Sequence, residues 1–224
     1  ARKSFGPGKV GNHPHPAGPN YKSLAAFLDK QPKDAPFCFW FGASDPHRPY
    51  EPGIGRKNGI DPAAVKLFPF VPDNDITRGD VADYYFEVQR FDREVGDALA
   101  ELEKRGLLDN TIVVITGDHG MPFPRCKGNL YDCGAQVPLA IRWPKGIPAN
   151  RTVTDLVSLT DLAPTFLAAA GLPLPHPMRH TQSLFSSTKR TRMFLERERH
   201  ANVREGNLSY PVRGVRTADY LYLH

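Results

Sequence analysis

A chain of 224 residues, of which 40% are hydrophobic, is long enough to form one large domain around a packed core, and this composition excludes a disordered protein. The formal net charge of +5 comes from 29 Lys and Arg residues interleaved with 24 Asp and Glu residues. We therefore expect a mixed surface with some preference for anions and no nucleic-acid partner. No apolar run approaches the roughly 20 residues that a membrane span requires.

The first third of the chain predicts one helix and one buried strand. Residues 1–20 are rich in Pro, Gly and His and predict a loop, and residues 21–30 predict a short helix. The apolar run at residues 37–43 is bounded by Pro and Asp and predicts a buried strand. Residues 48–75 show no sustained period, so we expect a long irregular excursion of the kind that is often functional in compact domains.

The clearest element is a long amphipathic helix at residues 80–105. Apolar side chains recur there at spacings of three and four residues, and Gly106 lies where a glycine that ends a helix is expected. Two short apolar runs, residues 111–116 and 138–143, then predict strands.

The last third of the chain predicts a helix and a small sheet. Residues 158–172 predict a helix that Thr160 or Asp161 could cap and that Gly171 closes. Short strands are expected at residues 193–198, 212–217 and 220–224. Strand–helix–strand alternation followed by an antiparallel piece predicts an α/β domain with a C-terminal sheet appendage.

Polar side chains follow two of the predicted strands. His47 and Arg48 come after the strand at residues 37–43, and Asp118 and His119 come after the strand at residues 111–116, with Lys127 a few positions on. Open α/β sheets bind ligands outside the carboxyl ends of their strands. A carboxylate can hold a divalent cation while Lys and His bind the oxygens of a sulfate or phosphate, so the sequence predicts an anion site beside a metal.

Each of these runs also has a plainer interpretation. An Asp-His-Gly sequence after a strand can be an ordinary turn, Asp45-Pro-His can be an Asx-turn, and Lys127 can lie on the surface. His13 and His15 favour a Pro-rich loop over a metal site. Residues 192–200 are interpreted as the exposed, charged end of a strand, although Arg199 and His200 could line a pocket.

The chain holds three cysteines, Cys38, Cys126 and Cys133, which form no C-x-x-C pair, and an odd number leaves at least one of them unpaired. Cys38 lies in an apolar run and is expected to be a small buried hydrophobic residue. Cys126 and Cys133 could form a disulfide, but their spacing does not require one.

At these residues the sequence resembles the formylglycine-dependent sulfatases of the alkaline-phosphatase superfamily, and within them the sulfamidase (heparan N-sulfatase) branch and bacterial arylsulfatase-A-like enzymes. The resemblance covers nearly the whole chain and rests on FWFGASDPHRPYEPG, FDREVGDALAELEKRGLLDNTIVVITGDHGMPFPRCKGNLYDCGAQVPLAIRWP, LVSLTDLAPTFLAAAGL and YPVRGVRTADYLYLH. It implies a partial alkaline-phosphatase-like sandwich with helices packed on a mixed sheet. Residues 1–180 would form the C-terminal portion of the catalytic domain, and residues 181–224 the beginning of an antiparallel C-terminal subdomain.

The resemblance also implies roles for individual residues. Asp118 and His119 would be calcium ligands, although many relatives carry Asn at the second position. Lys127 would bind the sulfate, where sulfamidase carries Arg, and His47 would contact the sulfate or the leaving group, as a general acid. The residues that would line the substrate pocket are Arg48, Glu198 and His200.

The nucleophile of the family does not occur in this chain. In the family, a formylglycine is made from Cys in a C-x-P-S-R-type motif, preceded by an Asp-Asp metal pair and followed by a Lys-x-x-His-like segment. None of the three cysteines lies in such a motif, and no Asp-Asp dipeptide occurs. We therefore expect a fragment that lacks the N-terminal part and the end of the C-terminal subdomain, with no turnover and weak calcium binding of its own.

For the full-length protein, the resemblance implies an exported (periplasmic, extracellular or lysosomal) hydrolase of a sulfated sugar or glycosaminoglycan-like substrate, although no signal peptide is visible. Two alternatives stay open. One is a phosphatase, phosphodiesterase or phosphonate hydrolase of the same superfamily, and the other is a catalytically dead, sulfatase-like carbohydrate-binding protein. A C-x-P-S-R motif encoded upstream of Ala1 would discriminate among them, and the oligomeric state is left open.

Overall fold

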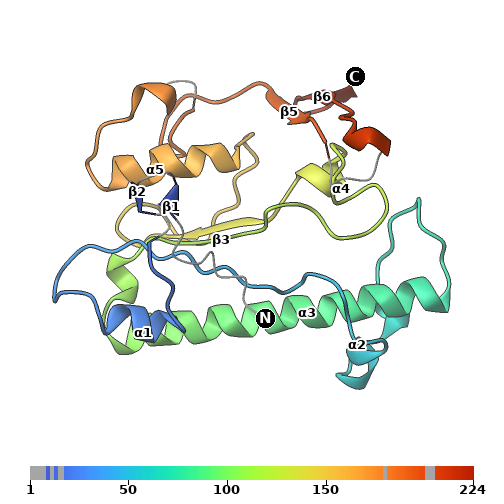
Figure 1. Ribbon diagram of the computed structural model, residues 1–224, viewed down its shortest axis with the longest axis horizontal. Helices are drawn as coiled ribbons and strands as arrows, with labels where there is room; N and C mark the ends of the chain where they lie inside the picture. The colour runs from blue at the N-terminus through green and yellow to red at the C-terminus, as the bar shows by residue number, and fades with distance from the viewer. Residues whose placement is uncertain (1–8, 11–12, 15–17, 179–180, 200–204) are drawn as a thin grey trace. The chain divides into compact units, whose positions relative to one another are not determined.

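The computed structural model describes residues 9–10, 13–14, 18–178, 181–199 and 205–224 (Figure 1). The chain forms two compact units. Unit 1 comprises Ala1–Ile112 and Trp143–Lys145, and unit 2 comprises Val113–Arg142 and Gly146–His224. Helices alternate with small antiparallel sheets along the chain, which confirms the predicted mixed α/β class.

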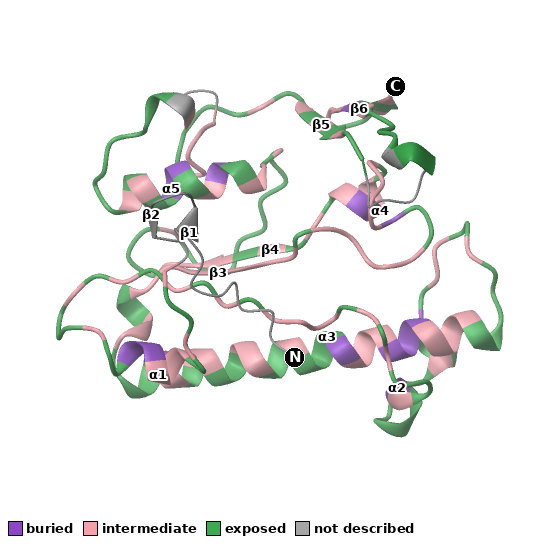
Figure 2. Cartoon of the chain, in the orientation of Figure 1, coloured by how far each residue is buried: buried purple, intermediate pink, exposed green. Residues whose placement is uncertain are grey.

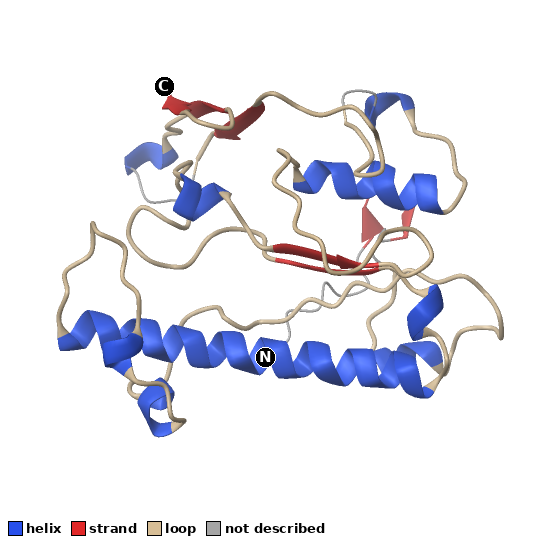
Figure 3. Cartoon of the chain, turned by 180° about the vertical axis from the view of Figure 1, so that it is seen from behind, coloured by secondary structure: helices blue, strands red, loops and turns tan. Residues whose placement is uncertain are grey.

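Unit 1 is built along one long helix, α3 (Asp75–Lys104), which Figure 3 shows from behind. The helix begins where the Asn74 side chain accepts a hydrogen bond of 2.9 Å from the Thr77 amide. Gly106 follows the last turn with a φ of 67°, the left-handed conformation of a glycine that ends a helix. The predicted helix is confirmed, and it starts earlier than residue 80 because Asn74 supplies a cap inside a stretch rich in Pro.

Shorter helices pack against α3 within unit 1. The carboxylate of Asp83, on α3, accepts hydrogen bonds of 2.8 Å from the amides of Gly53 and Gly55. A Cβ at Gly55 would lie 2.3 Å from the Ala82 carbonyl oxygen, so the two backbones meet without room for a side chain. The excursion predicted at residues 48–75 is therefore partly helical. The shorter helices of unit 1 are α1 (Leu24–Leu28), α2 (Ile54–Lys57), η1 (Pro62–Ala64) and η2 (Leu108–Asn110).

The strand predicted at residues 37–43 is not formed, because a strand needs a hydrogen-bonded neighbour and no described residue provides one. Burial nevertheless alternates along this segment (Figure 2). The rings of Phe27 and Phe39 lie 4.9 Å apart, whereas Trp40 is 84% exposed. Cys38 is exposed as well, so the prediction that it is buried is wrong.

The N-terminal residues, predicted as loop, contain a short antiparallel pair, β1 (Lys9–Val10) and β2 (His13–Pro14). Pairing of two residues requires no apolar periodicity, which is why the sequence pattern gave no sign of it. His15 lies outside the described residues.

Unit 2 contains the two strands predicted in the middle of the chain. β3 (Val113–Thr116) pairs antiparallel with β4 (Leu139–Arg142), with Val113 opposite Arg142 and Thr116 opposite Leu139. The Thr116 hydroxyl donates to the Pro138 carbonyl oxygen at 2.8 Å, which holds the ends of the two strands together. Between them lies the short helix α4 (Asp132–Ala135).

A helix and a three-stranded sheet complete unit 2. α5 (Leu162–Ala169) follows η3 (Leu159–Asp161), and Gly171 ends it with a φ of 68°. Asp161 holds the N-cap position of α5, as predicted, but its carboxylate accepts from the Ser158 amide and from Arg190 and not from an α5 amide. The Ser158 side chain caps η3. The remaining elements are η4 (His176–Met178), η5 (Glu205–Asn207) and the antiparallel sheet β5 (Met193–Arg197), β6 (Val212–Arg216) and β7 (Leu221–Leu223), which confirms the predicted strands. Throughout the described chain, no helix has both the length and the apolar character needed to cross a membrane.

Candidate anion and metal site

The turn that follows β3 is fixed by close contact between two backbone segments. The Gly120 amide donates to the Gly134 carbonyl oxygen at 2.9 Å. A Cβ at Gly120 would lie 1.9 Å from the Cys133 carbonyl oxygen, and a Cβ at Gly134 would lie 2.2 Å from that of Cys126. The turn at residues 117–120 is thus held against α4 at positions where only glycine fits.

This turn carries Asp118 and His119. His119 Nδ1 lies 2.8 Å from the Gly120 carbonyl oxygen, and because a carbonyl only accepts, Nδ1 is the protonated nitrogen of the neutral ring. When the ring is neutral its lone pair is on Nε2, which lies 3.5 Å from Asp118 Oδ1. The Asp118 side chain is 88% exposed, so the carboxylate and the imidazole nitrogen together face solvent as two donors for a cation.

The Asp118 carboxylate is an oxygen ligand of the kind that calcium prefers, whereas the His119 imidazole offers a nitrogen, so the pair does not complete a calcium site. Calcium takes roughly six to eight oxygen ligands. No group of three or more His, Cys, Asp or Glu side chains in the described part of the chain is arranged to hold a metal ion. Asp118 and His119 therefore fit a calcium ion only if further ligands come from elsewhere.

Lys127 projects from a loop that folds back on itself. Its amide donates to the Met121 carbonyl oxygen at 3.0 Å, and the Asn129 amide donates to that of Cys126 at 3.0 Å. Gly128 turns the chain with a φ of 77°. The Lys127 side chain is half-buried, and its ammonium pairs with no carboxylate of the described residues, so it is available to an anion.

Two arginines that the sequence pattern did not reveal join the C-terminal sheet to the Lys127 loop and to α4. Arg197, on β5, donates to the Gly128 carbonyl oxygen. Arg216, on β6, places Nε 3.0 Å from Asp132 Oδ1. These partners are 69 and 84 positions apart in the chain, so no local pattern could have predicted them.

Glu198 lies just past β5 and is held by Arg213 in an ion pair. Its side chain is 64% exposed, and its carbonyl oxygen accepts a hydrogen bond of 3.0 Å from the Tyr210 amide. His200, predicted to line a pocket, lies outside the described residues.

In unit 1, the run after residue 43 forms a turn that presents His47 to solvent. The His47 amide donates to the Ser44 carbonyl oxygen at 2.8 Å. His47 Nδ1 donates to the Arg48 carbonyl oxygen at 2.5 Å, which leaves Nε2 of the neutral ring as a proton acceptor. Asp45 pairs with Arg90 of α3 at 3.2 Å, which ties the turn to the long helix.

Arg48 is directed inward, toward α3. Its guanidinium makes two hydrogen bonds to Asp80, of 2.9 and 2.5 Å, and lies 4.6 Å from the centre of the Tyr50 ring. The hydrogen bond to Asp80 is the main reason that the pKa of Arg48 is raised. Burial raises the pKa of Tyr50, whose hydroxyl donates to the Pro46 carbonyl oxygen at 3.0 Å. Arg48 is thus fixed in place.

Some of the predicted site residues belong to unit 1 and others to unit 2, and the residues of each unit are described separately. Asp118 and His119 share one turn of unit 2, and Lys127 follows on the adjoining loop. His47 and Arg48 share one turn of unit 1.

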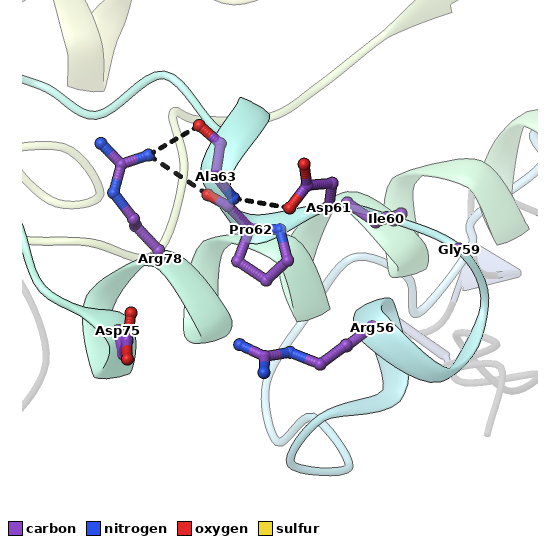
Figure 4. Close-up of a pocket in the computed structure, with 8 residues that line it drawn as sticks. All are labelled: Arg56, Gly59, Ile60, Asp61, Pro62, Ala63, Asp75 and Arg78. Atoms are coloured by element: carbon purple, nitrogen blue, oxygen red, sulfur yellow. Dashed lines mark hydrogen bonds between the residues drawn. The ribbon is translucent and has the colours of Figure 1, made fainter.

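Unit 1 also has a surface hollow of about 680 Å³ (Figure 4). Arg78 lies at its wall, but this side chain donates to the carbonyl oxygens of Pro62 and Ala63, both at 3.2 Å, and to the Asp73 carboxylate. The Asp61 carboxylate likewise accepts from the Ala63 amide. Arg78 and Asp61 thus bind backbone groups of the segment that lines the hollow, and they do not point together at a position where a ligand could bind.

Comparisons of the sequence and of the fold with known proteins identify similar proteins. A family model described as Sulfatase matches residues 10–172. Human N-sulphoglucosamine sulphohydrolase is 33% identical over 208 residues, which are 87% of this chain and 40% of that protein. A solved structure in complex with its substrate D-glucosamine-2-N,6-O-disulfate is 29% identical with a TM-score of 0.58, over 66% of this chain and 32% of that chain.

A phosphonate monoester hydrolase from Silicibacter pomeroyi is 25% identical with a TM-score of 0.57, over 77% of this chain and 38% of that chain. The chain thus spans less than half the length of each of these proteins.

Proposed function

This chain belongs to the sulfatase family, and from that premise we propose that it is part of a hydrolase that cleaves the sulfate ester or sulfamate of a sulfated sugar. The observation that carries the proposal is the half-buried residue Lys127. Its ammonium has no carboxylate partner among the described residues, and it follows the Asp118–His119 donor pair on the adjoining loop. A positive charge on the loop that follows two donors for a cation suits an anion such as sulfate.

Each residue in this proposal has a distinct task. Lys127 would donate to a sulfate oxygen and offset its charge, while His47, when protonated at Nε2, would give that proton to the leaving oxygen or nitrogen. Asp118 and His119 would contribute to a calcium site, and a bound calcium ion would stabilise negative charge on the sulfuryl group. The residues proposed to line the substrate pocket are Arg48, Glu198 and His200.

The nucleophile is proposed to be a formylglycine that lies outside these residues. Cys38 is followed by Phe-Trp-Phe, Cys126 by Lys-Gly-Asn and Cys133 by Gly-Ala-Gln, so none has the sequence from which the family makes formylglycine. The proposal further assigns residues 1–180 to the catalytic domain and residues 181–224 to a C-terminal subdomain. It also includes export to a periplasmic, extracellular or lysosomal compartment, the usual setting of the family.

The first test is binding, because it does not require the nucleophile. Lys127→Ala should weaken the affinity for glucosamine sulfates, measured by NMR titration, by about 10-fold or more, since a charge-assisted hydrogen bond contributes roughly 1.5–3 kcal/mol. Lys189→Ala is the matched control, because it removes one positive charge from an exposed pair with Asp155 in the same unit. Equal affinities of the two variants would remove the basis for the assignment.

Turnover is the second test. The pure 224-residue protein should not hydrolyse an aryl sulfate, because it lacks the nucleophile motif. Sulfate release above the rate of a heat-inactivated sample would contradict this expectation.

A second candidate activity is favoured by the similarity to the phosphonate monoester hydrolase. The two activities differ in the anion that they recognise. Competition between a sulfated sugar and a phosphonate monoester for the Lys127 site distinguishes them, and stronger binding of the phosphonate would favour the second candidate.

A further inference from the structure

Two cysteines border the Lys127 loop and have no part in the proposed reaction. Cys126 precedes Lys127 and is completely buried, with an exposed fraction of 0%, whereas Cys133, on α4, is half-buried. Both are free thiols in the structure.

The backbone places the two thiols side by side. Cys133 Sγ donates to the carbonyl oxygen of Arg125, at 3.3 Å, and that carbonyl belongs to the peptide bond that joins Arg125 to Cys126. The Cys126 carbonyl oxygen in turn lies against Gly134, the residue after Cys133. Burial, and a hydrogen bond that the Cys126 thiol donates to Cys133, raise the pKa of the Cys126 thiol to about 12. Three separate contacts thus bring Cys133 to Cys126.

We propose that Cys126 and Cys133 form a reversible disulfide that fixes the loop carrying Lys127. The closed ring would contain Lys127 and Gly128, so it would restrict the conformations open to the ammonium group. The bond itself is independent of the proposed function, whereas its effect on anion binding rests on that function.

The chemistry requires an external oxidant, which is a disulfide such as oxidised glutathione or the disulfide of a thiol oxidoreductase. The Cys133 thiolate, which is the more accessible of the two, attacks one sulfur of the external disulfide, and one thiolate leaves. The Cys126 thiolate then attacks the Cys133 sulfur of the mixed disulfide and displaces the second thiolate. The two cysteines lose two electrons, the external disulfide gains them, and the two protons end on the released thiols.

Peptide mapping tests the bond directly. The protein is equilibrated in a glutathione redox buffer, alkylated with iodoacetamide under denaturing conditions and digested with trypsin. Cleavage after Arg125, Lys127 and Arg142 leaves the dipeptide Cys126-Lys127 joined to peptide 128–142 only if the disulfide has formed. The joined species should be about 2 Da lighter than the sum of the two free thiol peptides and should disappear after reduction with dithiothreitol.

Cys38 provides the internal reference, because it is an exposed thiol of the same chain. The Cys133→Ser variant should give no joined peptide and should leave Cys126 to be alkylated after denaturation. Recovery of Cys126 and Cys133 as separately alkylated or glutathionylated peptides, in a sample whose Cys38 is oxidised, would overturn the proposal.

The effect on the loop is measured in the same samples. Oxidised wild-type protein should bind sulfate at least about 3-fold more tightly than reduced protein, and the Cys126→Ala/Cys133→Ala variant should show no redox dependence. A joined peptide with unchanged sulfate affinity would refute the effect on Lys127. If Lys127→Ala alone leaves sulfate binding intact, the proposed function fails while the disulfide stands on the peptide map.

Discussion

Gly120 shows how little space there is behind the Asp118–His119 turn. A methyl group at this position would lie 1.9 Å from the Cys133 carbonyl oxygen, so Gly120→Ala must displace α4. We expect a loss of roughly 1–3 kcal/mol in the free energy of unfolding, as for other overpacked sites. Urea denaturation followed by circular dichroism measures it.

Gly117→Ala is the control for this substitution. It lies in the same turn, but the nearest atom to its Cβ is at 3.6 Å, which is ordinary van der Waals contact. Its unfolding midpoint should stay near that of the wild type. Equal unfolding midpoints for Gly120→Ala and Gly117→Ala would show that α4 can move aside without a loss of stability.

For single residues, the sequence predicted where the candidate site residues lie along the chain better than it predicted which residues they contact. Asp118 and His119 do follow the strand that ends at Thr116, because an apolar run next to a glycine-bounded polar turn is a local signal. The close approach of Gly120 to the Cys133 carbonyl oxygen had no local signal, because it joins two separate segments of backbone. The partners of Arg197 and Arg216 could not be predicted, since they depend on how distant segments fold together.

Among the elements, α5 and the segment that follows it are joined by one buried carboxylate. Asp161 has an exposed fraction of 0% and accepts hydrogen bonds from the Ser158 amide at 2.9 Å and from Arg190 at 2.6 Å. Asp161→Asn leaves the Arg190 charge without its partner, so we expect a loss of roughly 3–5 kcal/mol in the free energy of unfolding at neutral pH. Asp155→Asn should cost at most about 1 kcal/mol, because its pair with Lys189 is exposed.

The pH dependence of this loss follows from the pKa of Asp161. Burial by itself would raise that pKa, but the hydrogen bonds from Arg190, Ser158 and Gln182 outweigh it, and the pKa is lowered. The stabilisation is therefore present above the unfolded value of about 3.9 and is lost as the pH falls through the lower folded value. The difference between wild type and Asp161→Asn should shrink in acid, and a difference that grows on acidification would contradict the assignment.

The C-terminal sheet and the Lys127 loop are coupled through Arg197. Arg197→Met removes its hydrogen bond to the Gly128 carbonyl oxygen, so the loop should open more often. Hydrogen exchange of the Asn129 amide should be about 10-fold faster, which corresponds to the loss of one hydrogen bond. Amides of β3 should exchange as in the wild type.

Arg213→Met is the comparison for this experiment, since Arg213 lies on β6 and pairs with Glu198 away from the loop. If both variants speed the exchange of Asn129 equally, the effect belongs to the sheet as a whole and not to the Arg197 contact.

Elements with a strong local signal were predicted, the strands β3 to β7 included, whereas residues 37–43 show where a local signal is not enough. α3 combines a sustained apolar period with a terminal glycine, and both can be read along the chain. Residues 37–43 have the composition of a buried strand, but a strand also needs a neighbour, and this lies outside any local pattern. The start of α3 was missed for a smaller reason, because the capping Asn74 stands among prolines.

On the scale of the whole molecule, the two units bury different kinds of side chain. Within the described residues, the buried hydrophobic side chains of unit 1 include Val81 and Leu102 of α3. The largest fully buried side chains are Thr165, Asp161 and Cys126, and all three belong to unit 2. Unit 1 also buries the carboxylates of Asp83 and Glu87, so buried charge is common to both units, whereas the buried large apolar side chains of the described residues lie in unit 1.

The donor count predicts how the whole chain responds to calcium. Asp118 and His119 provide two ligands, whereas even weak calcium sites of extracellular modules, with dissociation constants of about 10⁻⁴–10⁻³ M, use more oxygens. A ligand stabilises a protein appreciably only when its concentration approaches or exceeds the dissociation constant, so roughly 1 mM calcium chloride should raise the melting temperature by less than about 1 °C. Calorimetric titration should give a shallow curve that Asp118→Asn abolishes. A tight, stoichiometric isotherm would show that this chain holds a complete calcium site, with ligands beyond the Asp118–His119 pair.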